Sequence, residues 1–260
     1  MPFAASFWKQ FAATAALATV MLGSTGCQRL LMGPAKIHEV EERPDQVKDF
    51  AVLYGENCAG CHGVEGKNSP AFGMNNPLYY GIADDATIHN WSANGGPGGQ
   101  MPAFSTMAGG LLTDDQINVI VKGMRQRWAK PAMLVGMALP PYAASHPGDV
   151  SHGGQVYAQA CASCHGVADA NGAVMHPGKA GSITDPTYLS LISNQGLRTI
   201  TIAGRPDLGQ PDYRNDIPGH PLSDTEITDV VAWLSAHRLP EPGNPHPTGN
   251  GTELQRRTGQ

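Results

Sequence analysis

The chain has little charge and no excess of basic residues. Charged side chains make up 15% of its 260 residues, and the formal net charge at pH 7 is −5. Proteins that bind nucleic acid generally present a basic surface that neutralises phosphates. The acidic balance therefore excludes nucleic acid as a partner. The carboxylates are also scattered, without a pair at a spacing typical of acid/base catalysis.

Long hydrophobic runs and period-two alternation are scarce as well. The stretch from Phe11 to Gly26 is continuously apolar or small, and its 16 residues fall short of the roughly 20 that a transmembrane helix needs. It follows Lys9 and ends in small residues, which is typical of a bacterial secretion signal. We expect residues 1–26 to be a signal peptide. Since no segment alternates convincingly between polar and apolar residues, we expect almost no sheet.

Cysteine is sparse, and four of the 5 cysteines lie in two copies of one motif. Residues 58–62 read CAGCH and residues 161–165 read CASCH, which is the attachment signature for c-type haem. Two thiols one helical turn apart can each add to one vinyl group of a porphyrin, and the adjacent histidine then lies under the iron. A chance match arises only about 0.004 times in a chain of this composition. We therefore expect two covalently bound haem c groups rather than structural zinc or redox-active CxxC sites, attached through Cys58, Cys61, Cys161 and Cys164.

The fifth cysteine, Cys27, directly follows the apolar segment. Residues 24–27 (STGC) resemble a lipoprotein cleavage box, although Ser24 stands where an aliphatic residue is usual. In such a box the cysteine becomes the lipidated first residue of the mature chain, and the alternative is an uncleaved N-terminal anchor. A lone thiol in an exported protein needs an explanation, which lipidation supplies. We expect Cys27 and a tether at 28–44 to hold the protein on the membrane, on the periplasmic or extracytoplasmic side.

The two halves of the chain repeat beyond the haem motif. The motifs are 103 residues apart, and Tyr54 and Tyr157 stand at the same distance before each of them. A second set of matches has a constant offset of 109 and pairs Pro77, Tyr79, Ile82, Trp91 and Gly95 with Pro186, Tyr188, Leu191, Ile200 and Gly204. Six extra residues therefore enter the second half between its haem motif and Pro186.

Each half closes with a predicted amphipathic helix. Thr113 with Gln116, and Ser223 with Glu226, have the spacing of a capping box. Apolar residues then follow at helical spacing, namely Ile117, Ile120, Val121 and Met124 in the first half and Ile227, Val230, Val231 and Leu234 in the second. We also expect a helix before each haem motif, at Asp45–Cys58 and Ser151–Cys161.

This arrangement resembles the class I cytochrome c fold, in which the first and last helices cross and short helices surround the haem. The resemblance implies an all-α chain with two tandem cytochrome c domains, at 45–128 and 151–238. The Pro-rich residues 129–150 are interpreted as a linker. The tail at 239–260 lacks periodicity and is expected to be disordered.

The resemblance also implies how each iron is held. The fifth ligand in the family is the histidine of CxxCH, here His62 and His165, whose other ring nitrogen donates to a backbone carbonyl. Pro70 and Pro177 are the candidates for these carbonyls. The sixth ligand is commonly the methionine of a Met-Pro pair before the last helix, which is Met101 here. Met74 and Met107 are alternatives.

The second half lacks this methionine. Gln210-Pro211 stands where the repeat predicts a Met-Pro pair, and no methionine follows Met175. Gln210 could coordinate weakly, hydrogen-bond a water on the iron, or leave the position open, and we favour this group of options. His220 would instead give His/His ligation, and Met175 or His176 are further candidates. Arg198 and Arg205 are expected to be solvated surface residues rather than partners of haem propionates, and Trp91 and Trp233 to be packing residues.

Two haem domains on a lipid anchor favour electron transfer. The resemblance implies a membrane-tethered dihaem cytochrome c that carries single electrons from a respiratory or photosynthetic donor, such as a quinol-oxidising complex, to a terminal oxidase or reaction centre. The alternative is a dihaem oxidoreductase or sensor that uses an open sixth position on the second haem. An enzyme is less favoured because the second half offers no His/Arg or Glu/Arg set for peroxide cleavage and no spare cysteine.

Overall fold

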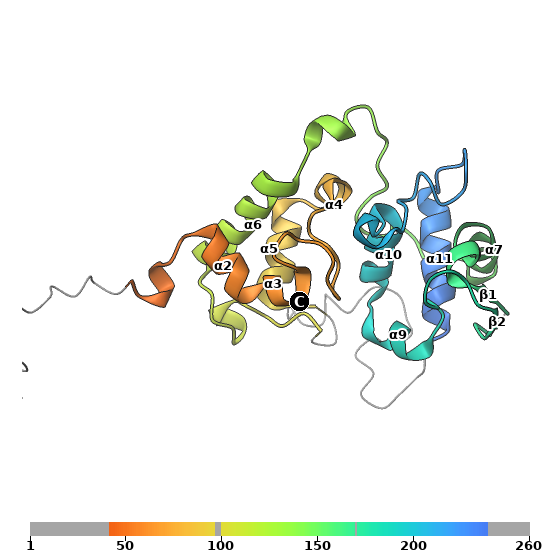
Figure 1. Cartoon of the computed structure of the whole chain (residues 1–260), viewed down its shortest axis with the longest axis horizontal. Coiled ribbons are helices and arrows are strands. Elements are labelled where there is room, and N and C mark those ends of the chain that lie inside the picture. Colours follow the sequence, from red (N-terminus) through yellow and green to blue (C-terminus); the bar gives the residue numbers. More distant parts are fainter. Residues whose placement is uncertain (1–41, 97–99, 170, 239–260) are drawn as a thin grey trace, which may run out of the picture. The chain divides into compact units, whose positions relative to one another are not determined.

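The computed structural model describes residues 42–96, 100–169 and 171–238 (Figure 1). The predicted signal peptide, Cys27, most of the predicted tether and the predicted disordered tail lie outside these residues. The residues from Val47 onward belong to one compact unit that includes both halves of the repeat, and residues 42–46 belong to another. No helix within the described ranges is both long and apolar enough to cross a membrane.

The regular secondary structure of the described residues is almost entirely helical. The α-helices of the first half are α2 (Phe50–Asn57), α3 (Ala59–His62), α4 (Pro77–Ile82), α5 (Asp85–Asn94) and α6 (Asp114–Trp128). Those of the second half are α7 (Val150–Ala160), α8 (Ala162–His165), α9 (Pro186–Leu191), α10 (Asn194–Ala203) and α11 (Asp224–Ala236). Short 3-10 turns are η1 (Pro44–Gln46), η3 (Thr106–Ala108), η4 (Pro131–Leu134) and η5 (Pro206–Leu208). This is the all-α class I cytochrome c architecture that the sequence predicts.

Both predicted capping boxes are present at the starts of α6 and α11. The hydroxyl of Thr113 accepts from the backbone N–H of Gln116, and the Gln116 side chain accepts from the backbone N–H of Thr113 in return. Ser223 and Glu226 make the same reciprocal bonds in α11. The predicted apolar positions of both helices are buried, with exposures from 0% at Ile117 to 7% at Val231. The helical period thus identified the core-facing side correctly.

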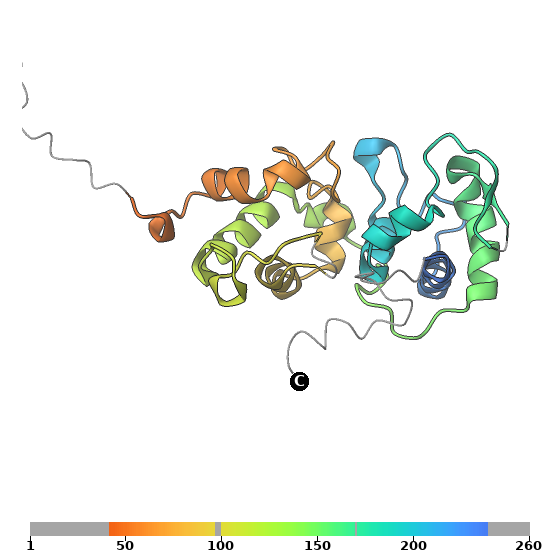
Figure 2. The ribbon, with the colours of Figure 1, turned by 90° about the horizontal axis from the view of Figure 1, so that it is seen from below.

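The first and last helices of the second half cross. In Figure 1 α7 is seen end-on beside the length of α11, and in Figure 2 α11 is seen end-on beside the length of α7. A glycine lies at the contact, because a Cβ added to Gly153 would come within 2.0 Å of the Asp229 carbonyl oxygen. Trp233 of α11 is 6% exposed and packs on Tyr157 of α7 with ring centroids 4.5 Å apart. Close backbone approach and aromatic packing therefore fix this crossing.

One small sheet is present in the described residues, in agreement with the prediction of almost none. Strands β1 (Val167–Ala168) and β2 (Val174–His176) pair antiparallel in the second half. The Asp169 carboxylate accepts from the backbone N–H groups of Asn171 and Ala173, and Gly172 has a φ of +81°. Asn-Gly is a strong hairpin turn, so this dipeptide was the signal that period-two counting missed.

Several of the residues 129–150, expected to be a linker, contact the second half. The Arg198 guanidinium donates to the carbonyls of Pro141 and Tyr142, with Nη2 2.8 Å from the Pro141 oxygen. The Tyr213 hydroxyl donates to the Ala138 carbonyl at 3.1 Å. Because the side chain of Arg198 is only 2% exposed, the carbonyls of Pro141 and Tyr142 accept from guanidinium N–H groups that water does not reach.

Candidate haem sites

The first CxxCH begins at Cys58, which ends α2, and its other residues form the short helix α3. The N–H of Cys58 closes α2 by donating to the Tyr54 carbonyl at 2.9 Å, and the N–H of His62 donates to the Cys58 carbonyl at 3.0 Å. The Tyr54 hydroxyl donates to the Gly63 carbonyl at 2.9 Å and so holds the end of the turn. One helical turn therefore carries both thiols and the imidazole, as haem attachment requires.

The second CxxCH repeats this geometry. The His165 N–H donates to the Cys161 carbonyl at 2.9 Å, and the Tyr157 hydroxyl donates to the Gly166 carbonyl at 2.8 Å. The tyrosines that the sequence comparison paired thus have the same role. They link the helix before each motif to the residue that follows its histidine.

None of the four cysteines of the two motifs is in a disulfide, and their surroundings suit a neutral thioether. Burial, reinforced by nearby acidic groups, raises the pKa of Cys58 and of Cys161 to about 12 in each case. A zinc site needs thiolates, which these positions disfavour. Across the described ranges, moreover, no group of three or more His, Cys, Asp or Glu side chains is placed to hold a metal ion. The residues therefore fit covalently bound haem and not zinc.

Both histidines are oriented by a backbone carbonyl. Nδ1 of His62 lies 2.7 Å from the Phe72 oxygen, and Nδ1 of His165 lies 2.8 Å from the Gly181 oxygen. With the proton on Nδ1, the Nε2 lone pair is left for iron. Burial lowers the pKa of His62, and the Arg205 guanidinium lowers it further against the opposing effect of the Phe72 carbonyl. The imidazole is thus kept in the neutral form that ligates.

The prediction that the carbonyls of Pro70 and Pro177 accept from the two imidazoles is wrong. In the first half the N–H of Ala71 donates to the Cys61 carbonyl, which places the following carbonyl, that of Phe72, at the imidazole. In the second half Ala180 makes the same bond to Cys164 and Gly181 follows it. The offset of 109 already holds at these residues, so the six inserted residues lie before Ala180, where the β1–β2 hairpin stands. The path of the loop, and not the residue type, determines which carbonyl accepts from the imidazole.

Met101 lies in the loop between α5 and α6. Its carbonyl accepts from the Gly96 N–H at 2.8 Å. Gly95 has a φ of +75°, and a Cβ there would come within 2.5 Å of the Met101 oxygen, so only glycine permits this closure. Of the alternatives, Met74 is buried at 9% exposure in the core of the first half, whereas Met107 is 94% exposed. The side chain of Met107 therefore faces solvent and not the interior.

Gln210 occupies the place of Met101 in the second half. Its carbonyl accepts from the Arg205 N–H at 3.1 Å, the counterpart of the bond between Gly96 and Met101. Gly204, with a φ of +68°, likewise approaches the Gln210 carbonyl, which would lie 2.8 Å from an added Cβ. Within the described part of the chain, the Gln210 amide group has no hydrogen-bond partner. The loop has the same geometry in both halves of the chain, but the Met101 thioether of the first half is replaced by the Gln210 amide in the second.

The other proposed ligands are held elsewhere. Nε2 of His220 lies 2.9 Å from the Glu226 carboxylate in the capping box of α11, and the His220 side chain is 56% exposed. Met175 and His176 lie on strand β2, on the chain between His165 and its carbonyl partner, and Met175 is 61% exposed. The structure does not bring these side chains together with Gln210.

The two arginines expected at the surface are both buried. Arg198 is 2% exposed and pairs with Asp224, and Arg205 is 8% exposed and pairs with Asp207. The Arg198–Asp224 pair joins α10 to α11, which no local pattern reveals, whereas Arg205 and Asp207 are close neighbours in one segment. The helical period of α10, which places Arg198 among buried residues, was the available signal.

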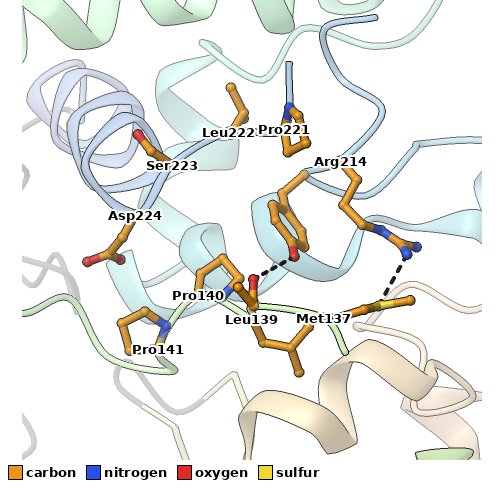
Figure 3. A pocket seen from close by; sticks show the side chains of 11 residues that line it. Met137, Leu139, Pro140, Pro141, Arg214, Pro221, Leu222, Ser223 and Asp224 are labelled. Atoms are coloured by element: carbon orange, nitrogen blue, oxygen red, sulfur yellow. Dashed lines mark hydrogen bonds between the residues drawn. The ribbon is translucent and has the colours of Figure 1, made fainter. Parts of the chain in front are cut away.

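A cavity of about 520 Å³ lies between residues 137–141 and the loop after Gln210 (Figure 3). Arg214 donates to the Met137 sulfur at 3.4 Å, and the side chains of Pro221 and Leu222 complete its wall. None of the predicted haem residues lines this cavity. It is therefore separate from the two candidate haem sites.

Comparisons with known proteins match both halves of the chain. Residues 45–122 match the family described as cytochrome c oxidase, cbb3-type, subunit III, and residues 150–238 match the cytochrome c family. With the helical fold and the two CxxCH turns, these matches show two cytochrome c-type domains in tandem. The chain carries two covalently bound haem c groups and is a haem electron-transfer protein.

Individual relatives resemble parts of the chain. The cbb3-type cytochrome c oxidase subunit CcoP of Azospirillum sp. (strain B510) is 29% identical over 124 residues, covering 44% of this chain and 37% of that protein. The matched region is thus well under half of the relative's length. A chain of the Kuenenia stuttgartiensis reducing HAO-like protein complex Kustc0457/Kustc0458 aligns with 74% of this chain and 99% of its own length, at 17% identity and a TM-score of 0.44.

Proposed function

We propose that the protein is a membrane-tethered dihaem electron carrier whose acceptor is a haem-copper oxidase of the cbb3 type. The proposal rests on the two tandem haem sites, and the acceptor on the similarity to a cbb3 oxidase subunit in the first half. Lipidation of Cys27 would hold the chain on the extracytoplasmic face, near a quinol-oxidising donor. A reaction centre would be the corresponding acceptor in a photosynthetic membrane.

The first site has a complete ligand set. Cys58 and Cys61 would form the thioethers, His62 would supply the fifth ligand and Met101 the sixth. Bound haem c supplies an iron that takes up and releases one electron between its Fe(II) and Fe(III) states. The Phe72 carbonyl holds the His62 ring, and the closed loop at Gly95 holds Met101. Both ligands are thus fixed before and after transfer, which keeps rearrangement small.

The second site has an open or weakly bound sixth position. Cys161, Cys164 and His165 repeat the attachment, and Gln210 replaces the methionine. The unpartnered Gln210 amide can hydrogen-bond a small ligand, which is the observation that favours the second candidate function, an oxidoreductase or sensor. His220 remains an alternative ligand, but it would have to leave Glu226.

The acceptor is tested by reoxidation of the reduced holo-protein. Membranes containing a cbb3-type oxidase should reoxidise it quickly, and membranes from a strain that lacks this oxidase should not. A Cys27→Ala variant should be released from the membrane fraction while keeping both haems. Equal reoxidation by both membrane preparations would contradict the proposed acceptor.

The open sixth position is tested by adding carbon monoxide to the reduced holo-protein. We expect one of the two haems to bind carbon monoxide and the oxidised protein to show one low-spin and one high-spin paramagnetic signal. Two low-spin haems that ignore carbon monoxide would remove the oxidoreductase or sensor candidate and favour His220 as the ligand.

A further inference from the structure

A buried ion pair lies where the two haem domains meet. Nε and Nη2 of Arg205 each lie 3.0 Å from one carboxylate oxygen of Asp207. Both side chains are 9% exposed. Hydrogen bonding to Arg205 lowers the pKa of Asp207, so the carboxylate stays ionised. The pair is bidentate and largely shielded from water, and bidentate arginine–carboxylate contacts are geometrically specific.

Both members of this pair bind the loop that serves His62. Nη2 of Arg205 donates to the Ser69 carbonyl at 2.9 Å, and the N–H of Asn68 donates to Asp207 at 2.9 Å. The same loop contains Phe72, whose carbonyl orients the His62 ring. The ion pair therefore holds the fifth-ligand loop of the first domain in place.

Additional contacts close the same interface. The Asn76 amide donates to the Ala203 carbonyl at 2.8 Å, and Leu78 of α4 is buried in the apolar core of the second domain. Asn76 also caps α4 by accepting from the Leu78 N–H. The interface thus combines polar contacts with apolar burial, so the ion pair is one part of a packed surface.

The other side of Arg205 binds the sixth-position loop of the second domain. Its backbone N–H and carbonyl both pair with Gln210, at 3.1 and 3.0 Å. One residue therefore connects the loop that orients His62 with the residue that replaces the methionine. The counterpart of Arg205 in the first domain is Gly96, which has no side chain. Only the second domain therefore has a side chain at this position that can contact the other domain.

We infer that Arg205 and Asp207 are positioning residues for electron exchange between the two haems. The pair fixes the fifth-ligand side of the first site against the sixth-ligand side of the second, and so sets one orientation for transfer. The exchange moves one electron from a ferrous to a ferric iron, with no bond formed and no proton released. The inference rests on the proposed ligand assignments. Buried ion pairs are poor sources of stability, and a role in fixing geometry accounts for this one.

The test is the rate of electron exchange within the isolated holo-protein after a brief reducing pulse. Arg205→Gln should slow this exchange on the order of tenfold, because mutations within a coupling network change coupling by amounts of this size. Arg205→Lys should recover part of the rate but lack the bidentate contact. Asp207→Asn removes the charge at nearly unchanged shape and should also slow the exchange.

Arg214→Gln is the matched control. Arg214 pairs with Asp212 at 2.7 Å in the same segment, and within the described residues it has no bond to the His62 loop. Exchange in this variant should be as fast as in the unaltered protein. All variants must first show two bound haems by mass. Exchange at the unaltered rate in both Arg205→Gln and Asp207→Asn would overturn the inference, as would equal slowing in Arg214→Gln.

A second measurement keeps the inference testable if exchange becomes too slow to record or a variant loses a haem. The hyperfine-shifted proton resonances of the His62 ring should move in Arg205→Gln and Asp207→Asn, although both substitutions are in the other domain. Unchanged His62 resonances would overturn the inference. Neither measurement uses a donor or acceptor protein, so failure of reoxidation by the oxidase would leave both interpretable.

Discussion

At the scale of single residues, small differences distinguish two otherwise equivalent sites. Met101 and Gln210 occupy the same place in the same loop, and their carbonyls accept equivalent bonds. A thioether is a soft, neutral iron ligand, whereas an amide oxygen binds iron weakly. The proposed difference between the two irons would therefore arise from one side chain and not from a different fold.

Gln210→Met should convert the second site into a copy of the first. Because the loop geometry is already present, the thioether should bind the iron, abolish carbon monoxide binding and raise the reduction potential of that haem. A carbon monoxide difference spectrum and a redox titration measure these effects. Gln210→Leu is the control and should keep carbon monoxide binding. If His220 is the true ligand, His220→Ala will create carbon monoxide binding that the unaltered protein lacks.

Tyr54→Phe and Tyr157→Phe should each destabilise the holo-protein by about 1–3 kcal/mol, because each leaves a glycine carbonyl, partly buried at Gly63 and buried at Gly166, without its donor. The two hydroxyls make equivalent bonds, at 2.9 and 2.8 Å. Guanidinium unfolding followed by circular dichroism gives the free energies. Tyr142→Phe provides a comparison with a partly buried tyrosine outside the haem turns. An unchanged unfolding midpoint in both haem-turn variants would show that these bonds do not hold the motifs.

At the scale of elements, caps and helix crossings set where each loop begins. The capping boxes start α6 and α11 directly after the loops that carry Met101 and Gln210. The crossing of α7 and α11 supports the turn with Cys161. The ends of the helices therefore fix where the loops with the proposed ligands begin and end, and the proposed ligands Met101 and Gln210 lie in these loops rather than on a helix face.

Thr113→Ala should lower the free energy of unfolding by about 1 kcal/mol, the usual cost of losing an N-cap. Thr106→Ala, at an exposed position of η3, should change it little and serves as the control. Chemical denaturation of the holo-protein measures both. Equal effects of the two substitutions would mean that the cap bond contributes nothing beyond removal of a threonine.

The contact of His152 with Asp229 should make stability depend on pH. Nδ1 of His152 lies 2.7 Å from the Asp229 carboxylate, and this hydrogen bond raises the pKa of His152 above its usual value of 6.5. A raised folded-state pKa gives stability that is fully present below pH 6.5 and is lost as the pH rises through the folded-state pKa. The difference in unfolding midpoint between the unaltered protein and His152→Gln should therefore shrink over that window. A difference that grows with pH would contradict the assignment.

At the scale of the whole molecule, the cofactors complete two small cores. Each half forms its own apolar cluster, and Leu78 of the first half joins the cluster of the second. Domains of this size bury limited surface without help. The haems are therefore part of the fold as well as of the function.

Replacing all four haem-attaching cysteines by alanine should yield a chain with much less helix than the holo-protein. The physical reason is that the residues around each CxxCH lose the porphyrin on which they pack. Far-ultraviolet circular dichroism and protease sensitivity measure the loss. Restoring Cys58 and Cys61 alone should recover part of the signal and one haem by mass. Full helicity in the haem-free chain would show that the apolar clusters suffice.

Features set by neighbouring residues were predictable from the sequence, and those set by distant ones were not. Thr113 with Gln116 identified a helix start because both partners lie in one turn. The carbonyl of Phe72 could not be chosen over that of Pro70, because the choice depends on how the loop returns to Cys61. Arg205 was misassigned to the surface because its partner Ser69 lies in the other half of the chain. Only the folded chain brings these residues together.

The contact between the domains joins unlike faces, since the loop around Phe72 in one meets the loop around Gln210 in the other. An interface between two different surfaces is of the head-to-tail kind, so the two ends of the pair of domains differ. It leaves the Met101 loop unmatched at one end and the Gly181 loop, with its β-ribbon, at the other. A redox partner that docks at one end therefore contacts a different surface from a partner that docks at the opposite end.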